Sequence, residues 1–335
     1  SRVRASGAAS AGSATAVNGD ELDFTINGAG DGLLVEYAAI TSFNIPATNG
    51  IVHAIDQVLV PPPATVVEAL VANELDTLVA ALNLTGLTST LSGAGPFTVF
   101  APSEAAFVAL PPGVLNALLG NTTALSNLLR YHVVAGDLKA GDVLAASTLA
   151  SLADANPELL VDQVLGGAYI NEAQISITDI EADNGVVHVI DAVLQPPVDL
   201  VSTLQARGFD ELVAAVSEAG LVTTVKGGTF TVFAPTDAAF TALYDSLGIS
   251  GPSEVDDEQL IDILTYHLVG GEVLASGAAS TGSATAVNGD DLTFSVNGAG
   301  DGLFVDGAAI TSFNIPATNG VVHVIDAVLL PPDNG

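Results

Sequence analysis

The 335-residue sequence predicts an α+β protein in which one domain is repeated along the chain. One stretch of sequence returns at a constant interval, which indicates a repeat. Within a copy, apolar residues at helical spacing come first, and short strand-like runs separated by Gly, Asn and Asp follow. We expect residues 1–62 to be the second half of a domain, and residues 63–197 and 198–335 to be two whole domains.

The repeat is clearest in a stretch of eight residues. Asn49-Gly-Ile-Val-His-Ala-Ile-Asp56 returns as Asn184-Gly-Val-Val-His-Val-Ile-Asp191 and as Asn319-Gly-Val-Val-His-Val-Ile-Asp326, so successive copies are 135 residues apart. Two further markers, an apolar run and a Tyr-His pair, occur in the last two copies only. Because neither occurs before residue 62, the sequence is expected to open inside a domain. The two markers are Phe97-Thr-Val-Phe-Ala-Pro102 with Phe230-Thr-Val-Phe-Ala-Pro235, and Tyr131-His132 with Tyr266-His267.

Proline marks the end of each copy. Leu59-Val-Pro-Pro62, Leu194-Gln-Pro-Pro197 and Leu330-Pro-Pro332 each close an apolar run, and proline stops a strand and stiffens the connection that follows. Short proline joints favour a semi-rigid rod of domains. Residues 5–61 match residues 275–331 at most positions without a gap, whereas the copy between them has diverged. We interpret this alternation as duplication of a two-domain unit.

The last copy shows the expected order of elements. Residues 198–219 carry apolar side chains at helical spacing with a break at Gly208, and Thr236 stands where a helix N-cap belongs. Residues 230–234 are expected to form a buried strand and residues 258–268 a helix. Four successive strands are expected afterwards, at residues 292–296, 302–306, 308–313 and 321–329.

Charge excludes two classes of partner. Six Lys and Arg stand against 38 Asp and Glu, a net charge of −32, so neither nucleic acid nor an anionic membrane is an expected partner. The acidic residues are scattered, which predicts folded domains with acidic surfaces and favours a marine or halophilic source. No apolar run reaches the roughly 18 residues that membrane insertion requires. The absence of cysteine excludes disulfides and thiolate metal sites.

Three markers in a fixed order resemble the fasciclin (FAS1) domain family. They are Thr231-Val-Phe-Ala-Pro-Thr-Asp-Ala-Ala-Phe240, the pair Tyr266-His267, and the stretch from Asn319 to Pro332. The copy before it shows the same markers, with Ser103-Glu104 in place of Thr-Asp. This resemblance implies a wedge-shaped β-sandwich of two sheets with a flanking helical layer, repeated in tandem. It also implies secreted or surface proteins of cell adhesion and matrix.

Repeated histidines raise the question of a metal or catalytic site. No HExxH pattern or ligand cluster accompanies them, so we expect core histidines that hydrogen-bond to backbone or carboxylate. The histidines and closing aspartates of the eight-residue stretch are therefore assigned a structural role: His53, His188, His323, Asp56, Asp191 and Asp326. For the Tyr-His pairs the family resemblance implies integrin-type adhesion contacts, which makes candidates of Tyr131, His132, Tyr266 and His267.

Two glycine-rich loops resemble ion-binding loops. Residues 27–32 and 297–302 share the sequence Asn-Gly-Ala-Gly-Asp-Gly, which lacks the ligand pattern of an EF-hand and is better explained as a hairpin turn. Weak calcium binding by Asp31 and Asp301 stays open, and no other cofactor is expected.

The sequence therefore predicts a protein that works through its surfaces. No nucleophile–base set or paired carboxylates are found, so catalysis is not expected. The leading interpretation is an extracellular adhesion or matrix protein that presents tandem domains to a protein or glycan surface partner, with avidity from repetition. One alternative is a structural subunit of a surface filament or stalk, in which neighbouring FAS1 domains contact one another. The other is a glycan or small-ligand binding module.

Overall fold

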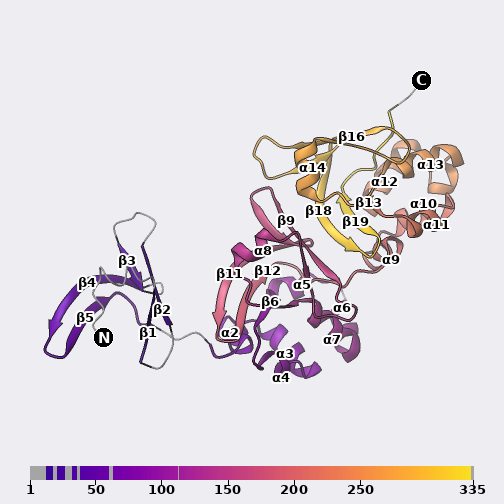
Figure 1. Ribbon diagram of the computed structural model, residues 1–335. Helices are drawn as coiled ribbons and strands as arrows, with labels where there is room; N and C mark the ends of the chain where they lie inside the picture. Colours follow the sequence, from indigo (N-terminus) through magenta and orange to yellow (C-terminus); the bar gives the residue numbers. More distant parts are fainter. Residues whose placement is uncertain are drawn as a thin grey trace. The chain divides into compact units, whose positions relative to one another are not determined.

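The computed structural model describes residues 13–17, 21–26, 32–35, 38–59, 63–111 and 113–332. The chain divides into two compact units, Ser1–Pro62 and Pro63–Gly335 (Figure 1). We call residues 1–62 the first segment, residues 63–197 the middle copy and residues 198–335 the third copy. The middle and third copies together make up the second unit.

The middle and third copies have the same order of elements, with most of the helices before most of the strands. The middle copy contains α2 (Val66–Ala72), α3 (Asp76–Thr85), α4 (Thr88–Leu91), β6 (Phe97–Pro102), α5 (Glu104–Val108), α6 (Val114–Leu119), α7 (Thr122–Tyr131), β7 (Val133–Ala135), α8 (Ala140–Ala145), β8 (Thr148–Ala150), β9 (Glu158–Val164), β10 (Gly167–Ile170), β11 (Ala173–Ala182) and β12 (Gly185–Ile190). The third copy contains α9 (Leu200–Ala206), α10 (Asp210–Glu218), α11 (Val222–Gly227), β13 (Phe230–Pro235), α12 (Asp237–Leu247), the 3-10 helix η1 (Pro252–Glu254), α13 (Asp257–Tyr266), β14 (Leu268–Gly270), α14 (Ala275–Thr281), β15 (Ser283–Thr285), β16 (Asp291–Val296), β17 (Leu303–Val305), β18 (Ala308–Ala317) and β19 (Gly320–Ile325).

Local sequence explains where several helices begin and end. Thr236 is the N-cap of α12 and its hydroxyl accepts from the amide of Ala239 at 3.2 Å, as predicted. Gly208 has a φ of 76° and separates α9 from α10, which confirms the expected break. The helix expected over residues 258–268 ends at Tyr266, because the chain continues as strand β14. Helix α14 was not predicted, since Ala, Ser and Gly give it no apolar periodicity.

The middle and third copies each contain one seven-stranded sheet, and the order of the strands is the same in both. In the third copy the order is β14-β13-β19-β18-β17-β16-β15, and β13 pairs with β19 in parallel. An isolated bridge between Val269 and Ala286 brings the last strand, β15, back to the first, β14, so the sheet curls round. Register shifts in β18 mark the bulged region where such a sheet bends. The two layers of the expected sandwich are therefore opposite walls of a curled sheet.

The third copy has two hydrophobic cores, one on each side of this sheet. Helices α9, α10 and α13 pack on one face of β13 and β19, around residues such as Leu204, Leu212 and Val322. The other core lies inside the curl and includes Phe233 and Leu292. The middle copy repeats both cores. An α+β domain with a helical layer on a sheet, in tandem, is thus confirmed.

The first segment contains only strands in its described residues. They are β1 (Ser13–Thr15), β2 (Glu21–Ile26), β3 (Leu33–Val35), β4 (Ala38–Ala47) and β5 (Gly50–Ile55), in that order across one sheet. Strand β4 has the same ten residues as β18. Burial differs, however: Ile45 is 42% exposed while its counterpart Ile315 is 2% exposed. The face that helices cover in the third copy is therefore open in the described part of this segment.

Candidate functional site

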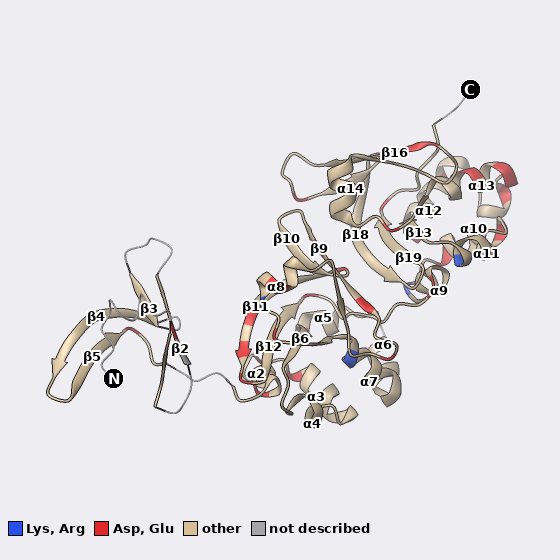
Figure 2. Cartoon of the chain, viewed as in Figure 1, with Lys and Arg blue, Asp and Glu red and all other residues tan. Residues whose placement is uncertain are grey.

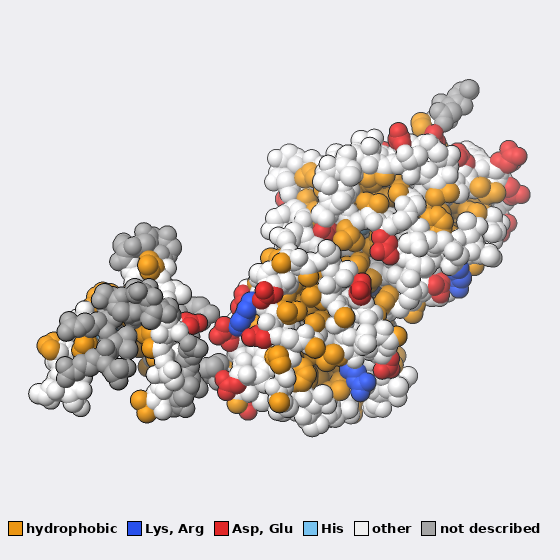
Figure 3. Space-filling view, viewed as in Figure 1, with side chains coloured by type: hydrophobic (Ala, Val, Ile, Leu, Met, Phe, Trp, Pro, Cys, Tyr) orange, Lys and Arg blue, Asp and Glu red, His pale blue; other side chains and the backbone are white. Residues whose placement is uncertain are grey.

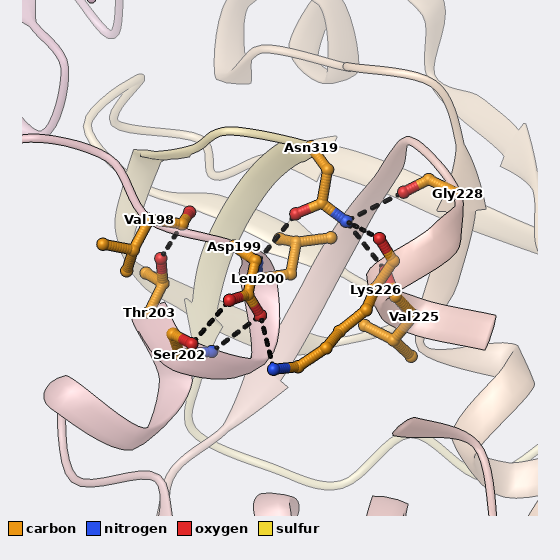
Figure 4. Close-up of polar contacts among 9 residues, drawn as sticks. All are labelled: Val198, Asp199, Leu200, Ser202, Thr203, Val225, Lys226, Gly228 and Asn319. Carbon is orange, nitrogen blue, oxygen red and sulfur yellow. Dashed lines mark hydrogen bonds and ion pairs between the residues drawn. The ribbon is translucent and has the colours of Figure 1, made fainter. Parts of the chain in front are cut away.

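The first residue of the repeated stretch, Asn319, joins the two halves of the third copy. We call residues 198–270 the helical half of this copy and residues 271–332 its strand half. Figure 4 shows the Asn319 side chain between them: its Oδ1 accepts from the amide of Leu200 at 2.8 Å. Its Nδ2 donates to the carbonyls of Val225 at 2.8 Å and Gly228 at 2.9 Å. One amide side chain thus satisfies backbone groups at the start of α9 and the end of α11.

The middle copy repeats this contact at Asn184. Its Oδ1 accepts from the amide of Val66 at 2.7 Å, and its Nδ2 donates to the carbonyls of Leu91 and Gly93, both at 2.8 Å. Asn184 is buried, whereas the corresponding Asn49 of the first segment is exposed. In both the middle and the third copy, this asparagine therefore links the strands at the end of the copy to the helices at its start.

The histidines of the repeated stretch are buried and hydrogen-bonded to backbone in the middle and third copies. His323 is fully buried, donates from Nε2 to the carbonyl of Val273 at 2.8 Å, and stacks on Phe233 with ring centroids 5.4 Å apart. His188 is placed in the same way, on the carbonyl of Leu138 and against Phe100. His53 of the first segment is partly buried.

The Tyr-His pairs, which the family resemblance made adhesion candidates, lie inside the domains. Tyr131 and His132 are 0% and 1% exposed, and Tyr266 and His267 are 3% and 1% exposed. His267 donates from Nδ1 to the carbonyl of Ile263 and accepts at Nε2 from the amide of Leu329, at 2.8 and 2.9 Å.

Tyr266 and Tyr131 make corresponding contacts on the strand half. The Tyr266 hydroxyl donates to the Asp306 carboxylate at 2.6 Å. The Tyr131 hydroxyl accepts from Asn171 at 3.0 Å. The described geometry uses these side chains within the fold, and a partner would have to open the domain to reach them.

Burial keeps His132, His267 and His323 neutral. Desolvation lowers the pKa of His132, His267 and His323 to about 4 in each case, although a hydrogen bond to a backbone carbonyl partly opposes it. Desolvation also raises the pKa of Tyr131 and Tyr266. None of these groups is poised to exchange a proton at neutral pH, so they are suited to holding the fold.

The aspartate that ends the repeated stretch accepts a corresponding backbone hydrogen bond in all three copies. Asp326 Oδ1 accepts from the amide of Ala309 at 2.8 Å, and Asp191 Oδ1 accepts from that of Gln174 at 2.7 Å. Asp56 Oδ1 accepts from the amide of Ala39 at 2.8 Å. Each carboxylate thus fixes the end of one strand to its antiparallel neighbour.

Asp301, one of the two calcium candidates, gains no further side-chain ligand among the described residues. Asp301 is exposed, and its Oδ1 accepts from the Asn297 side chain at 2.8 Å within the hairpin loop. Asp31 lies outside the described residues. Where the structure is described, no three His, Asp or Glu side chains are grouped as a metal ion would require.

A joint between the middle and third copies contains polar contacts that the sequence did not predict. The hairpin of β9 and β10 lies beside α14 and β18 (Figure 1). Asp162 on β9 is 5% exposed, and its Oδ2 accepts from Asn314 Nδ2 at 2.7 Å and from the amide of Ser276 at 3.1 Å. A carboxylate of one copy is thus stabilised by neutral hydrogen-bond donors of the next.

Two other pairs complete this joint. Glu172 and Arg207 form an ion pair whose side chains are 7% and 22% exposed. Tyr169 packs edge-on against Phe313, with ring centroids 4.8 Å apart. Val164, next to the hairpin tip, belongs to the core of the third copy. The two copies therefore share packed apolar and paired charged groups. A cleft of about 520 Å³ beside them is lined by residues that include Glu172 and Arg207.

The outer surface of the two complete copies is acidic. Figure 2 shows Asp and Glu on many elements and few Lys or Arg, with one cluster at the start of α13. That cluster comprises Glu254, Asp256, Asp257 and Glu258, all exposed. In Figure 3 the hydrophobic side chains on the visible face are interspersed with polar and acidic groups. Among the described residues, no helix has the length and hydrophobicity needed to span a membrane.

The comparisons with known proteins agree with this architecture. The family model of the Fasciclin domain matches residues 1–61, 73–196 and 207–331. Protein sll1483 of Synechocystis is 44% identical over 138 residues, which covers 40% of this chain and 74% of that protein. Cell surface glycolipoprotein MPB83 of Mycobacterium bovis is 40% identical over 119 residues, 34% of this chain and 50% of that protein.

A longer match is to an animal protein. Transforming growth factor-beta-induced protein ig-h3 of Oryctolagus cuniculus is 38% identical over 187 residues, 56% of this chain. This match spans only 26% of the length of that relative. The relatives belong to a non-enzymatic family, which confirms the expectation that the chain is not an enzyme. With three segments matched by one family model, the chain belongs to the fasciclin domain family.

Proposed function

We propose that the chain is part of an extracellular adhesion or matrix protein that presents tandem fasciclin domains to a surface partner. The observation that carries this proposal is how the polar residues are used. The repeated Asn, Tyr and His side chains of the complete copies act inside the fold, so the acidic outer surface is what each copy offers to other molecules. A relative that is named a cell surface glycolipoprotein supports this setting.

The physical basis of such binding is repetition and charge. Six basic residues cannot neutralise 38 acidic ones, and the described part of the second unit shows four ion pairs. A surface that offers cationic groups, or bound divalent cations, would meet complementary charge on every copy. Repetition of a weak contact along one chain raises avidity without any new contact.

Binding of the labelled full chain to intact cells and to isolated extracellular matrix tests this proposal. We expect retention on at least one of these surfaces, with a retained fraction that falls as NaCl is raised. A chain with Glu254, Asp257 and Glu258 changed to Gln should be retained less, while hydrogen exchange shows that the third copy stays folded. Absence of retention on every surface, or retention that neither salt nor these substitutions alter, would refute the proposal.

The joint between copies favours a second candidate function, a stalk or filament. The contacts of the joint are head-to-tail, because one surface of the middle copy meets a different surface of the third copy. Head-to-tail contacts that do not close into a ring can continue from copy to copy and build an extended assembly. Electron microscopy of the purified chain separates the candidates: regular filaments support the structural role, and separate short rods support adhesion.

A further inference from the structure

We propose that the joint between the middle and third copies fixes the order of copies: a copy of the middle type accepts a copy of the third type after it, and rejects one of its own type. This inference rests on the contacts of the joint and does not depend on the proposed function. Its central element is Asp162, a nearly buried carboxylate on the β9–β10 hairpin, which requires a hydrogen-bond donor opposite it.

The middle copy has an aspartate where the third copy supplies that donor. Asp179 has a φ of 57° on β11, and Asn314 has a φ of 59° on β18. Asp179 Oδ1 accepts from the amide of Ala140 at 2.8 Å, just as Asn314 Oδ1 accepts from that of Ala275 at 2.9 Å. The two side chains therefore occupy equivalent places, and they differ in one atom: an amide nitrogen in Asn314 and a carboxylate oxygen in Asp179.

That one atom decides the sign of the interaction. In the joint as it stands, Asn314 Nδ2 donates to Asp162 at 2.7 Å. If a middle-type copy followed, the same geometry would place the carboxylate of Asp179 against that of Asp162. Two like charges at contact distance in a site this buried repel strongly, and neither can donate a hydrogen bond while both are ionised.

The ion pair of the joint gives the same preference. Arg207 ends helix α9 of the third copy and pairs with Glu172. The middle copy ends its equivalent seven-residue helix α2 with Asn73. A middle-type copy in second place would leave Glu172, only 7% exposed, without a cation. Two separate positions thus favour the same order, partly by attraction and partly by rejection of the alternative.

Asn314→Asp in the full chain reproduces this mismatch with one substitution. The third copy should still fold, because the new aspartate can accept from Ala275 as Asp179 does from Ala140 in the middle copy. The reciprocal variant Asp162→Asn with Asn314→Asp restores one carboxylate and one amide. Gln259→Glu, on the exposed surface of α13, adds the same charge away from the Asp162 contact and is the matched control.

The readout is the distance between spin labels in the two copies. The sequence has no cysteine, so Thr123→Cys and Ser217→Cys, both at exposed positions, give one label in each copy. We expect one narrow distance distribution in the parent and in Gln259→Glu, a broad one in Asn314→Asp, and a narrow one again in the reciprocal variant. Hydrogen exchange at β12 and β19 reports whether both copies stay folded.

Several outcomes would overturn the ordering proposal. One is a narrow distribution in Asn314→Asp. Another is a broad distribution in the reciprocal variant while both copies remain protected from exchange. Unfolding of the third copy in the Asn314→Asp variant would also count against the proposal, because Asn314 and Asp179 would then not be equivalent.

Discussion

Replacement of Asn319 by alanine removes the side chain that joins the helical and strand halves of the third copy. Its Oδ1 is the acceptor of the Leu200 amide, and its Nδ2 donates to the carbonyls of Val225 and Gly228. Alanine can form none of these bonds. The substitution removes little apolar contact, so the loss of stability reports mainly on the unpaired backbone groups.

The size of the effect follows from those groups. A buried donor or acceptor left without a partner costs about 1–3 kcal/mol. Asn319 is only partly buried and water can reach some of the site, so we take about 1 kcal/mol for each of the three groups. The resulting loss of about 3 kcal/mol is a large part of the 5–15 kcal/mol that stabilises a typical domain. For a domain of this size it lowers Tm by about 10 °C.

Urea unfolding followed by hydrogen exchange and mass spectrometry measures this loss copy by copy. The third copy of Asn319→Ala should unfold at lower urea, while the middle copy should show a much smaller change. Asn49→Ala is the matched control, because the same motif residue is exposed in the first segment, and it should change stability by less than about 0.5 kcal/mol. An unchanged third copy in Asn319→Ala, or an equal loss in Asn49→Ala, would refute the reasoning.

Three further predictions concern pH, the joint and salt. Since the pKa of His267 and His323 is about 4 in the folded chain and about 6.5 when unfolded, the unfolded chain binds protons first as pH falls below 6.5. Each of these two histidines should lower the free energy of unfolding by about 2 kcal/mol at pH 5, and the loss should be complete below pH 4. NMR shifts of the ring protons that titrate near 6.5 in the folded chain would contradict this prediction. Arg207→Gln should cost about 2 kcal/mol by urea unfolding because it leaves Glu172 buried and unpaired, and adding Glu172→Gln should recover most of it; no recovery would mean that the pair is not the cause. Raising NaCl should raise Tm by screening the net charge of −32, and a Tm that falls with salt would argue against self-repulsion and against the halophilic source, which stays a prediction.

Local signals were enough to predict the elements that depend on a few neighbouring residues. Thr236 stands before a helix and Gly208 separates two helices, and both act at short range. The fold class followed from the repeat and from the order of helical and strand patterns. Helix α14 escaped prediction because its small residues carry no periodic apolar face, and packing between strands and the joint keeps it helical.

The candidate site was predicted only in part, because its contacts join distant residues. The structural role assigned to His188 and His323 agrees with their burial. The sequence did not reveal that Asn319 reaches residues more than 90 positions away, although the asparagine recurs in all three copies. Asp162 lies in an ordinary strand, and its partner is 152 residues further on. No local pattern could have connected them.

Hydrogen exchange at the three copies of the repeated stretch tests the central claim, that these residues join a strand half to a helical half and leave the outer surface for partners. Strand β12 pairs in parallel with β6, and β19 pairs in parallel with β13, whereas β5 is the last strand of its sheet among the described residues. We predict slow exchange for the amides of Val186 and Val321 and fast exchange for Ile51, their counterpart. Equal protection at all three positions would contradict the account.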